Sequence, residues 1–455
     1  MQKVKPALLR GFDQEYLPAE QLQFNHLVDI IRRNFELYGF LPIETPSAER
    51  QEILTSKGAA DKEIYALRRL AEADEDDAAA KGALRFDLTV PLARYVAMRE
   101  RELAFPFRRY QIQRVWRGET PQANKGRWRE FYQCDIDIIG REKLSTLAEA
   151  EIPSVIYSVF KEMAIGEFRI RINNRKVLKG LLEHFGVTQE STAAVLRTLD
   201  KIEKQSGDEI KQSLEKDGVI AKYAEGLYSV FVSMPAKPRG TSETLELLTG
   251  HLNGSEIGKA GLEELNNVVK AIRQFGVPDA AFGVDLSVVR GLDYYTGTIY
   301  ETTLTKYPEL GSICSGGRYD DLASYFTDTR LPGVGISIGL TRLFSRLSEA
   351  GLLQPLARTP AEVLVTTMDH QYLDKYLKMA TALRAVGINT EVYLEAAKLG
   401  NQLTYADRKG FRLALIAGEN EFSKNVVQVK HLASKTARDV PMDGLVAAVR
   451  ETLAS

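Results

Sequence analysis

The segment "VRGLDYYTGTIYE", residues 289–301, gathers residue types that bind small polar molecules. It holds Arg290 next to a glycine, and Tyr294 and Tyr295 follow closely. An arginine can pair with an acidic group, a glycine lets a ligand approach the backbone, and a phenol offers an apolar ring with a hydroxyl. A core strand does not have this composition, so the segment indicates a site for a small polar ligand.

A second group lies in "VWRGETPQANKGRWREF", which supplies Arg117 and Glu119 and then Arg127 and Phe131. Arginines around an aromatic ring suit a nucleoside triphosphate, because guanidinium groups clamp phosphate oxygens and the ring stacks on the base. Basic runs are more often solvated surfaces. Here they bracket a loop between two strands whose face also carries acids, which favours a site.

Two further stretches leave alternatives open. In "LRFDLTVPLARY", Asp87 and Thr89 suit an ammonium group, but an Asp and a Thr this close also cap helices. In "LPGVGISIGLTRL", a glycine-lined strand runs into a helix that carries Arg342, which suits phosphate or base but also a plain surface arginine. A dinucleotide fold is disfavoured, because the glycines lie inside the strand rather than after it.

The elements that must position these residues follow from periodicity. Apolar spacing predicts a helix over residues 20–38 and an antiparallel hairpin over 107–140. Period 2 on the second strand of the hairpin places four side chains on one face: Phe131, Gln133, Asp135 and Asp137. A solvent-exposed sheet face is the simpler explanation for the polar residues, but it explains poorly the aromatic ring among them.

The rest of the chain divides by pattern. Residues 175–285 are mostly helical, strand character returns over 286–355, and alternating strands and helices from Ala361 predict a compact α/β unit. The last unit carries a modest basic cluster that suits an RNA backbone or a solvated helix face equally well: Lys398, Arg408, Lys409 and Arg412. A length of 455 residues agrees with two or three domains.

Composition excludes several classes of protein. With 44% hydrophobic and 27% charged residues, the chain is typical of folded soluble proteins, and no apolar run reaches membrane-spanning length. There are 60 basic and 61 acidic residues, so a nucleic-acid partner would need local basic patches. Cys134 and Cys314 form no metal or disulfide pattern, and no secretory signal is present, which favours the cytoplasm. The five histidines are scattered, so no metal site is expected.

Together these stretches resemble the histidyl-tRNA synthetases, a family of class II aminoacyl-tRNA synthetases, over nearly the whole chain. Residues 23–46 are similar to motif 1, "VWRGETPQANKGRWREF" to motif 2 and "GVGISIGLTRL" to motif 3. The stretches "VRGLDYYTG" and "SGGRYDDL" match two signatures that mark the histidine enzymes within the class. One departure is Thr341, which stands where motif 3 commonly has an acid before its arginine.

The resemblance implies an α/β (α+β) fold in four parts. An antiparallel-sheet class II catalytic core would occupy residues 1–174 and 286–355, interrupted by a helical insertion over 175–285. A C-terminal mixed α/β anticodon-binding domain would occupy 361–455.

The resemblance also assigns roles. Histidine would be bound by Asp87, Leu88, Thr89, Gln133, Asp137, Arg290, Tyr294 and Tyr295, with Gln133 on the amino group and Asp137 on the imidazole. ATP would be bound by Arg117, Glu119, Arg127, Phe131 and Arg342. Arg290 and Arg117 would act in catalysis, the first on the carboxylate and then the α-phosphate, the second on the α-phosphate. Mg²⁺ would accompany ATP, with no metal ligands assigned among the side chains.

The implied reaction joins L-histidine to ATP as histidyl-adenylate and then transfers the histidyl group to the 3′ end of tRNA(His), in a homodimer without a membrane partner. The alternative is a synthetase-like regulatory subunit of ATP phosphoribosyltransferase, which usually lacks the C-terminal domain and loses active-site residues. The retained arginines and the C-terminal unit favour the enzyme. A class I synthetase is disfavoured, because no HIGH sequence occurs.

Overall fold

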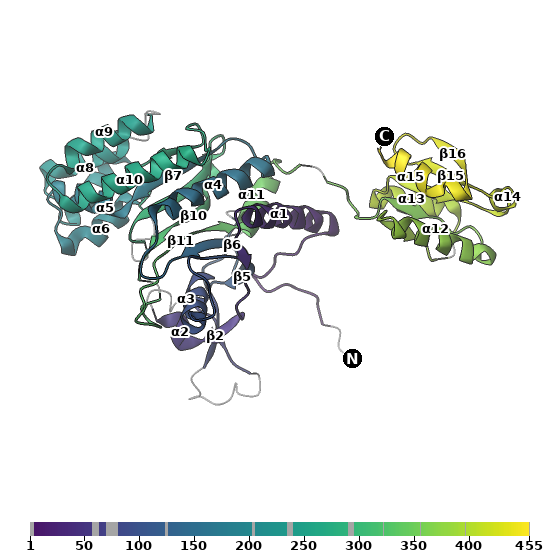
Figure 1. Cartoon of the computed structure of the whole chain (residues 1–455), viewed down its shortest axis with the longest axis horizontal. Coiled ribbons are helices and arrows are strands. Elements are labelled where there is room, and N and C mark those ends of the chain that lie inside the picture. Colours follow the sequence, from purple (N-terminus) through teal and green to yellow (C-terminus); the bar gives the residue numbers. More distant parts are fainter. Residues whose placement is uncertain are drawn as a thin grey trace. The chain divides into compact units, whose positions relative to one another are not determined.

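The computed structural model describes residues 4–56, 63–69, 81–122, 126–202, 205–233, 240–289, 295–321, 323–354, 356–395 and 397–454. The chain divides into two compact units (Figure 1). Met1–Gln14 with Leu27–Leu353 form the first, and Glu15–His26 with Gln354–Ser455 form the second. The sequence also contains an acidic low-complexity stretch, "AEADEDDAAAK" at 71–81, whose residues 71–80 lie outside the described residues.

The first unit is built on an eight-stranded sheet of order β1-β5-β6-β11-β10-β9-β7-β8. Its strands are β1 (Leu41–Pro42), β5 (Phe107–Trp116), β6 (Glu130–Ile139), β7 (Phe168–Asn174), β8 (Phe282–Val284), β9 (Thr298–Leu304), β10 (Ser312–Tyr319) and β11 (Gly333–Gly339). The strands from β5 to β7 are antiparallel to their neighbours, while β1 and β8 add parallel edges. The predicted hairpin and the predominantly antiparallel sheet are therefore confirmed.

The central strand β6 is buried on both faces. Cys134, Ile136 and Ile138 on one face are at most 1% exposed, as expected for a core. On the opposite face Asp135 and Asp137 are only 3% and 4% exposed. The solvent-exposed-face explanation for these polar residues is therefore wrong, because tertiary neighbours cover them.

The apolar face of the sheet is covered by helices (Figure 1). Helix α4 (Thr146–Met163) contacts β11, and α11 (Leu340–Glu349) follows β11 directly and contacts β6. The Tyr300 hydroxyl on this face donates to the Glu149 carbonyl of α4 over 2.6 Å. The predicted first helix is α1 (Pro18–Leu37), and it ends where Gly39 adopts a φ of 74°, a left-handed conformation that glycine allows without strain.

Smaller elements flank the sheet of the first unit. A three-stranded sheet contains β2 (Ala48–Arg50), β3 (Ala66–Leu67) and β4 (Gly82–Leu84), beside α2 (Gln51–Thr55) and α3 (Thr89–Arg99), and the short helix η4 spans Pro308–Leu310. Between β7 and β8 come α5 (Arg175–His184), α6 (Gln189–Leu199), α7 (Gly207–Lys216), α8 (Ala221–Ser233), α9 (Thr241–Leu252) and α10 (Glu256–Gln274). The helical character expected there is confirmed, while domain boundaries at 175 and 285 stay a prediction.

The second unit holds a five-stranded sheet of order β13-β12-β14-β15-β16. Its strands are β12 (Val363–Val365), β13 (Thr390–Val392), β14 (Leu413–Ile416), β15 (Val426–His431) and β16 (Ala437–Pro441). Its helices are η5 (His370–Tyr372), α12 (Leu373–Ala385), α13 (Leu399–Lys409), α14 (Glu419–Ser423), η6 (Met442–Gly444) and α15 (Leu445–Ala454). The predicted α/β unit is confirmed, with α14 and β16 as additions.

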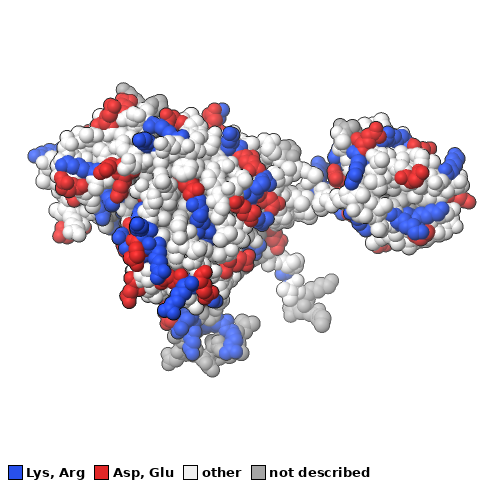
Figure 2. All heavy atoms as spheres, in the orientation of Figure 1, with Lys and Arg blue, Asp and Glu red and all other residues white. Residues whose placement is uncertain are grey.

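The charged side chains are mixed in sign over both units. On the visible face, basic and acidic residues alternate without a large area of one sign (Figure 2). This distribution matches the net charge of −1. Among the described residues no helix has both the length and the apolar character that a membrane span requires.

Candidate active site

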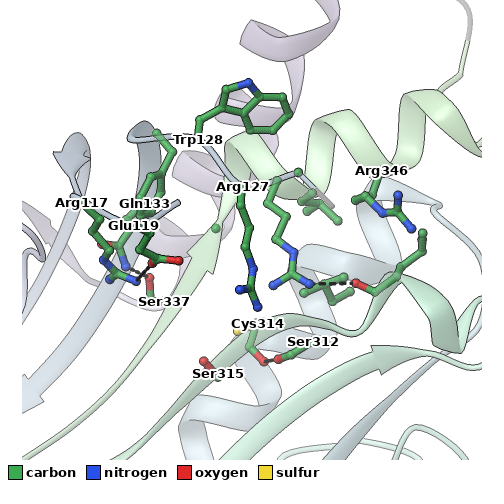
Figure 3. A pocket seen from close by; sticks show the side chains of 17 residues that line it. Arg117, Glu119, Arg127, Trp128, Gln133, Ser312, Cys314, Ser315, Ser337 and Arg346 are labelled. Carbon is green, nitrogen blue, oxygen red and sulfur yellow. Dashed lines mark hydrogen bonds and ion pairs between the residues drawn. The ribbon is translucent and has the colours of Figure 1, made fainter. Parts of the chain in front are cut away.

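A cavity of about 320 Å³ opens on the polar face of the sheet (Figure 3). Its wall combines the β5–β6 hairpin, β10, the end of β11 and the start of α11. All five predicted ATP-binding residues line it: Arg117, Glu119, Arg127, Phe131 and Arg342. The cavity also reaches Gln133, so the fold brings the two expected ligand sites into contact.

Arg117 is held in place at one side of the cavity (Figure 3). Its Nε donates to the Phe86 carbonyl over 2.9 Å, and its guanidinium lies 5.1 Å from the centroid of the Phe131 ring. The Glu119 carboxylate is 3.9 Å from the same guanidinium. These contacts fix the direction of a cation that can meet a phosphate oxygen.

Arg127 and Arg342 are brought together by a glycine. Gly126 has a φ of 65°, and a side-chain carbon there would lie only 2.9 Å from Cγ of Arg342. The loop of the hairpin therefore rests directly on α11. Arg127 is exposed to the cavity, and Arg346, one turn further along α11, also lines it. Three guanidinium groups from two elements suit a polyphosphate.

Thr341 has a specific structural role. Its hydroxyl accepts a hydrogen bond from the backbone N–H of Tyr132 over 2.8 Å, and the side chain is 2% exposed. The contact ties the first turn of α11 to β6 between Phe131 and Gln133. The acid that is common at this position is thus replaced by a neutral hydroxyl, which forms a hydrogen bond to the neighbouring strand.

The carboxamide of Gln133 lies deeper in the cavity. Its Nε2 donates to Oγ of Ser337 over 2.7 Å, and its Oε1 is buried with no hydrogen-bond partner among the described residues (Figure 3). An unsatisfied buried acceptor next to a cavity is costly unless a ligand supplies a donor. Gln133 therefore offers an acceptor to a cationic or N–H group.

Asp137 is held by two partners. A guanidinium nitrogen of Arg109 is 2.5 Å from its Oδ2, and the Tyr319 hydroxyl donates to its Oδ1 over 2.7 Å. Burial raises the pKa of Asp137 to about 6, although Arg109 and Tyr319 both favour its charged form. Two residues earlier, burial raises the pKa of Asp135 to about 7, and Asp137 and Asp87 add to that rise.

Asp87 and Leu88 lie directly before α3, and Thr89 is its first residue. Oδ1 of Asp87 accepts from the backbone N–H of Val90 over 3.1 Å, so the helix-capping alternative holds for this carboxylate. Leu88 is fully buried, and Asp87 and Thr89 are half-buried. Asp87 also acts electrostatically on Asp137, which places it beside the same cluster.

The tyrosine segment is described only from Tyr295 onward, and Arg290 and Tyr294 lie outside the described residues. Burial, followed by the nearby carboxylates of Asp137 and Asp135, raises the pKa of the Tyr295 phenol. A side-chain carbon at position 317 would lie 2.8 Å from the Tyr295 ring. A glycine in "SGGRYDDL" therefore makes room for the ring.

The "SGGRYDDL" segment is also held by ion pairs and hydrogen bonds. Arg318 is 2.7 Å from Glu149 of α4 and 3.2 Å from Asp320. The Thr296 hydroxyl donates to Asp320 over 2.5 Å, and the Thr296 N–H donates to the Arg318 carbonyl over 2.8 Å. These contacts hold the residues after Tyr295 against β10.

Several residues of the site were not predicted as such. They are Arg109, Asp135, Ser337, Tyr319 and Arg346. Asp135 was detectable, because the alternation of β6 places it between Gln133 and Asp137. The partners on β5 and β11 depend on strand register, which no local pattern gives.

Comparison with known proteins identifies the family. Residues 13–343 match the sequence model of "Histidyl-tRNA synthetase", and residues 362–452 match that of "Anticodon binding domain". The chain belongs to the histidyl-tRNA synthetase family. It is 46% identical to a histidine–tRNA ligase of Xanthomonas axonopodis pv. citri over 99% of this chain and 97% of that protein. A histidine–tRNA ligase of Stenotrophomonas maltophilia is also 46% identical, over 96% of each chain.

Solved structures agree with this family. The histidyl-tRNA synthetase of a Nostoc species has a TM-score of 0.89 and 40% identity, covering 99% of this chain and 100% of that one. An ATP phosphoribosyltransferase regulatory subunit/histidyl-tRNA synthetase from Bacillus halodurans has a TM-score of 0.72 over 89% of this chain and 97% of that one. Its identity is only 20%, so the likeness concerns the fold alone.

Proposed function

We propose that this chain activates L-histidine with ATP to histidyl-adenylate and transfers the histidyl group to the 3′ end of tRNA(His). Membership of the histidyl-tRNA synthetase family supports an ATP-dependent ligase. The observation that carries the proposal is the single cavity shared by the arginines and Gln133, beside the buried carboxylates.

In the proposed first step, the histidine carboxylate attacks the α-phosphorus of ATP and pyrophosphate leaves. Negative charge gathers on phosphate oxygens, and fixed arginines stabilise it without reorganising. Arg117 would meet the α-phosphate, and Phe131 would lie against the adenine face. Arg127 and Arg342 would hold the distal phosphates and adenosine, and Glu119 would orient Arg117.

Histidine would occupy the inner end of the cavity. Gln133, Asp87 and Thr89 would face its ammonium group, while Asp137 and Tyr295 would face the imidazole. A ligand without a ring N–H would remove one donor from this desolvated carboxylate, and hydrogen-bond selection of this kind can discriminate by about 10⁴-fold or more. In the same proposal Arg290 would hold the carboxylate, with Tyr294 shaping the pocket and Leu88 packing beneath it.

Mg²⁺ fits this site as a companion of ATP. The described residues contain no cluster of three or more His, Cys, Asp or Glu side chains that could hold a metal alone. Mg²⁺ commonly keeps several waters and binds substrate phosphates with few protein carboxylates, and Glu119 lines the cavity. When bound, the ion would neutralise phosphate charge.

The proposal includes tRNA binding by the C-terminal unit. The match to an anticodon-binding domain supports it, and a surface cavity there is lined by Asn401, Thr404, Tyr405, Arg408 and Lys409 of α13. We also propose a homodimer in the cytoplasm. Leu37 and Leu41 in the motif 1 region are 72% and 60% exposed, and a doubled mass in solution is the expected result.

The regulatory-subunit alternative is disfavoured by the retained arginines and the C-terminal unit. ATP–pyrophosphate exchange, with each amino acid offered singly, tests the proposal. Exchange should depend on histidine alone. Replacing Arg290 with Ala should depress exchange far more than tRNA binding. No exchange with any amino acid, in folded protein that still binds histidine, would support the regulatory alternative.

A further inference from the structure

The cavity is lined by a carboxamide of β6 and a hydroxyl of β11, and a buried carboxylate of β6 lies beside them. Strand register places Ser337 of β11 opposite Asp135 of β6, with Gln133 two residues away on the same face. Nε2 of Gln133 donates to Oγ of Ser337, and the Asp135 carboxylate lies opposite the same residue in the strand pair, where Ser337 favours its charged form. Gln133 and Asp135 are 8% and 3% exposed, so water competes little for these contacts.

These contacts have a direction. The Ser337 hydroxyl already accepts from Gln133, and an ionised carboxylate beside it can only accept, so the one proton of that hydroxyl is attracted toward Asp135. The oxygen of that hydroxyl then accepts a hydrogen bond from the NH₂ group of Gln133. The two ends of a carboxamide have nearly the same shape, and their partners decide which way each points. The Gln133 oxygen is therefore turned away from Ser337, buried and without a hydrogen-bond partner in the described chain.

We propose that Asp135, acting through Ser337, is a positioning residue that holds the Gln133 oxygen toward the α-ammonium group of histidine. This inference rests on the proposed function. An ammonium group carries only donors, so it needs an oxygen at this point and is repelled by an NH₂ group. With a neutral partner in place of the carboxylate, Ser337 can donate to Gln133 instead, and the carboxamide can present its NH₂ end to the ligand.

The surroundings make the charge of Asp135 depend on pH near neutrality. Arg109 on β5 favours its charged form, whereas Asp137 on β6 and Asp87 before α3 oppose it. The Tyr295 phenol, the Cys314 thiol of β10 and the Arg85 guanidinium also interact electrostatically with Asp135. Burial raises the pKa of Asp135 to about 7, so Asp135 takes up a proton below neutral pH. The carboxyl group then no longer fixes the orientation of the Ser337 hydroxyl and the Gln133 carboxamide.

The test compares histidine with 3-(imidazol-4-yl)propanoate, which keeps the ring and carboxylate but lacks the amino group. The readouts are the KM for histidine in ATP–pyrophosphate exchange and the inhibition constant of the analogue, both at pH 8. In Asp135→Asn and Ser337→Ala, the KM for histidine should rise roughly tenfold or more. The inhibition constant of the analogue and the KM for ATP should change by less than about threefold. Ser337→Thr keeps the hydroxyl and should stay close to the wild type.

Equal losses for histidine and the analogue would overturn the proposal, because the substitutions would then have altered the pocket as a whole. An unchanged KM for histidine would overturn it as well. Wild-type protein that shows no histidine-dependent exchange would instead contradict the proposed function, so the two failures are distinguishable.

A measurement on the wild type alone covers the case in which a variant fails to fold. The ratio of the analogue's inhibition constant to the histidine KM measures what the amino group contributes. The ring of the analogue is more basic because it lacks the ammonium group, so both constants are corrected for the fraction of neutral ring at each pH before the ratio is formed. The ratio should fall as pH drops from about 8 to about 6, through the pKa of Asp135. A constant ratio would contradict the role of Asp135.

Discussion

Arg109 and Asp137 form an ion pair inside the catalytic sheet, with a guanidinium nitrogen 2.5 Å from Oδ2 and side chains 0% and 5% exposed. The register pairs these two residues directly on β5 and β6. The pair lies on the polar face that the cavity enters. The ion pair therefore stabilises the core, and it also favours the charged form of the carboxylate that is assigned to the imidazole.

Arg109→Met should destabilise the protein at pH 8. Removing one partner leaves the other charge buried and unpaired, which costs about 3–5 kcal/mol. Urea unfolding followed by tryptophan fluorescence measures the shift in midpoint. The matched control is Arg99→Met, because Arg99 pairs with Glu102 over 3.0 Å with both side chains more than half exposed. The control should leave the urea midpoint close to that of the wild type, because an exposed ion pair contributes little to stability. Equal midpoints for the two variants would contradict this account.

Asp135→Asn should stabilise the protein at alkaline pH while it impairs histidine activation. Burial raises the folded-state pKa to about 7, whereas an unfolded aspartate has a pKa of about 3.9. The folded state therefore binds more protons between these values, and its stability falls as pH rises through them. The urea midpoint of the variant should exceed the wild-type midpoint at pH 8, and the difference should shrink toward pH 5. Asp137 titrates in both proteins and largely cancels.

The control for that comparison is Asp328→Asn, an exposed aspartate of the same unit. Its midpoint should track the wild type at every pH. A constant offset between Asp135→Asn and the wild type would show that the carboxylate does not titrate as assigned.

Gly335→Ala should disrupt the site. A side-chain carbon there would lie 2.2 Å from Oδ1 of Asp137 and 2.3 Å from the Ile136 carbonyl, and the backbone atom cannot move without parting β11 from β6. We expect loss of histidine-dependent exchange and a lower urea midpoint. Gly250→Ala is the control, since Gly250 lies in α9 with nothing within 4 Å of the added carbon. That change should be neutral or stabilise by up to about 1 kcal/mol. Normal exchange by Gly335→Ala would refute the close approach.

Thr341→Val should raise the KM for ATP and lower stability. The substitution keeps the shape but removes the acceptor of the Tyr132 N–H, and a buried donor left without a partner costs about 1–3 kcal/mol. The same contact sets the spacing between Phe131 and Arg342, which is why ATP binding should suffer. Thr341→Ser retains the hydroxyl and should behave like the wild type. ATP–pyrophosphate exchange at varied ATP concentration measures the KM, and urea unfolding measures the stability. If the Val and Ser variants behave alike in both, the Thr341 hydroxyl does not have this role.

Local patterns were sufficient for much of the architecture. Alternation assigned the two faces of β6, and a glycine-lined strand followed by an amphipathic helix predicted β11 and α11 with Arg342 at its start. These features depend on residues close together in the chain, so the periods of strand and helix reveal them. Motif spacing likewise placed the arginines around Phe131 in one loop.

The burial of the polar face and its partners was decided only by the tertiary structure. Gln133 and Ser337 are separated by 204 residues, and Asp137 and Tyr319 by 182. Their contacts depend on which strands pair and in what register, and a shift by one residue would turn each side chain to the opposite face. The sequence by itself therefore determined which chemical groups the catalytic sheet carries. The pairing of distant strands decided which of those groups are buried, how they are charged and which way they point.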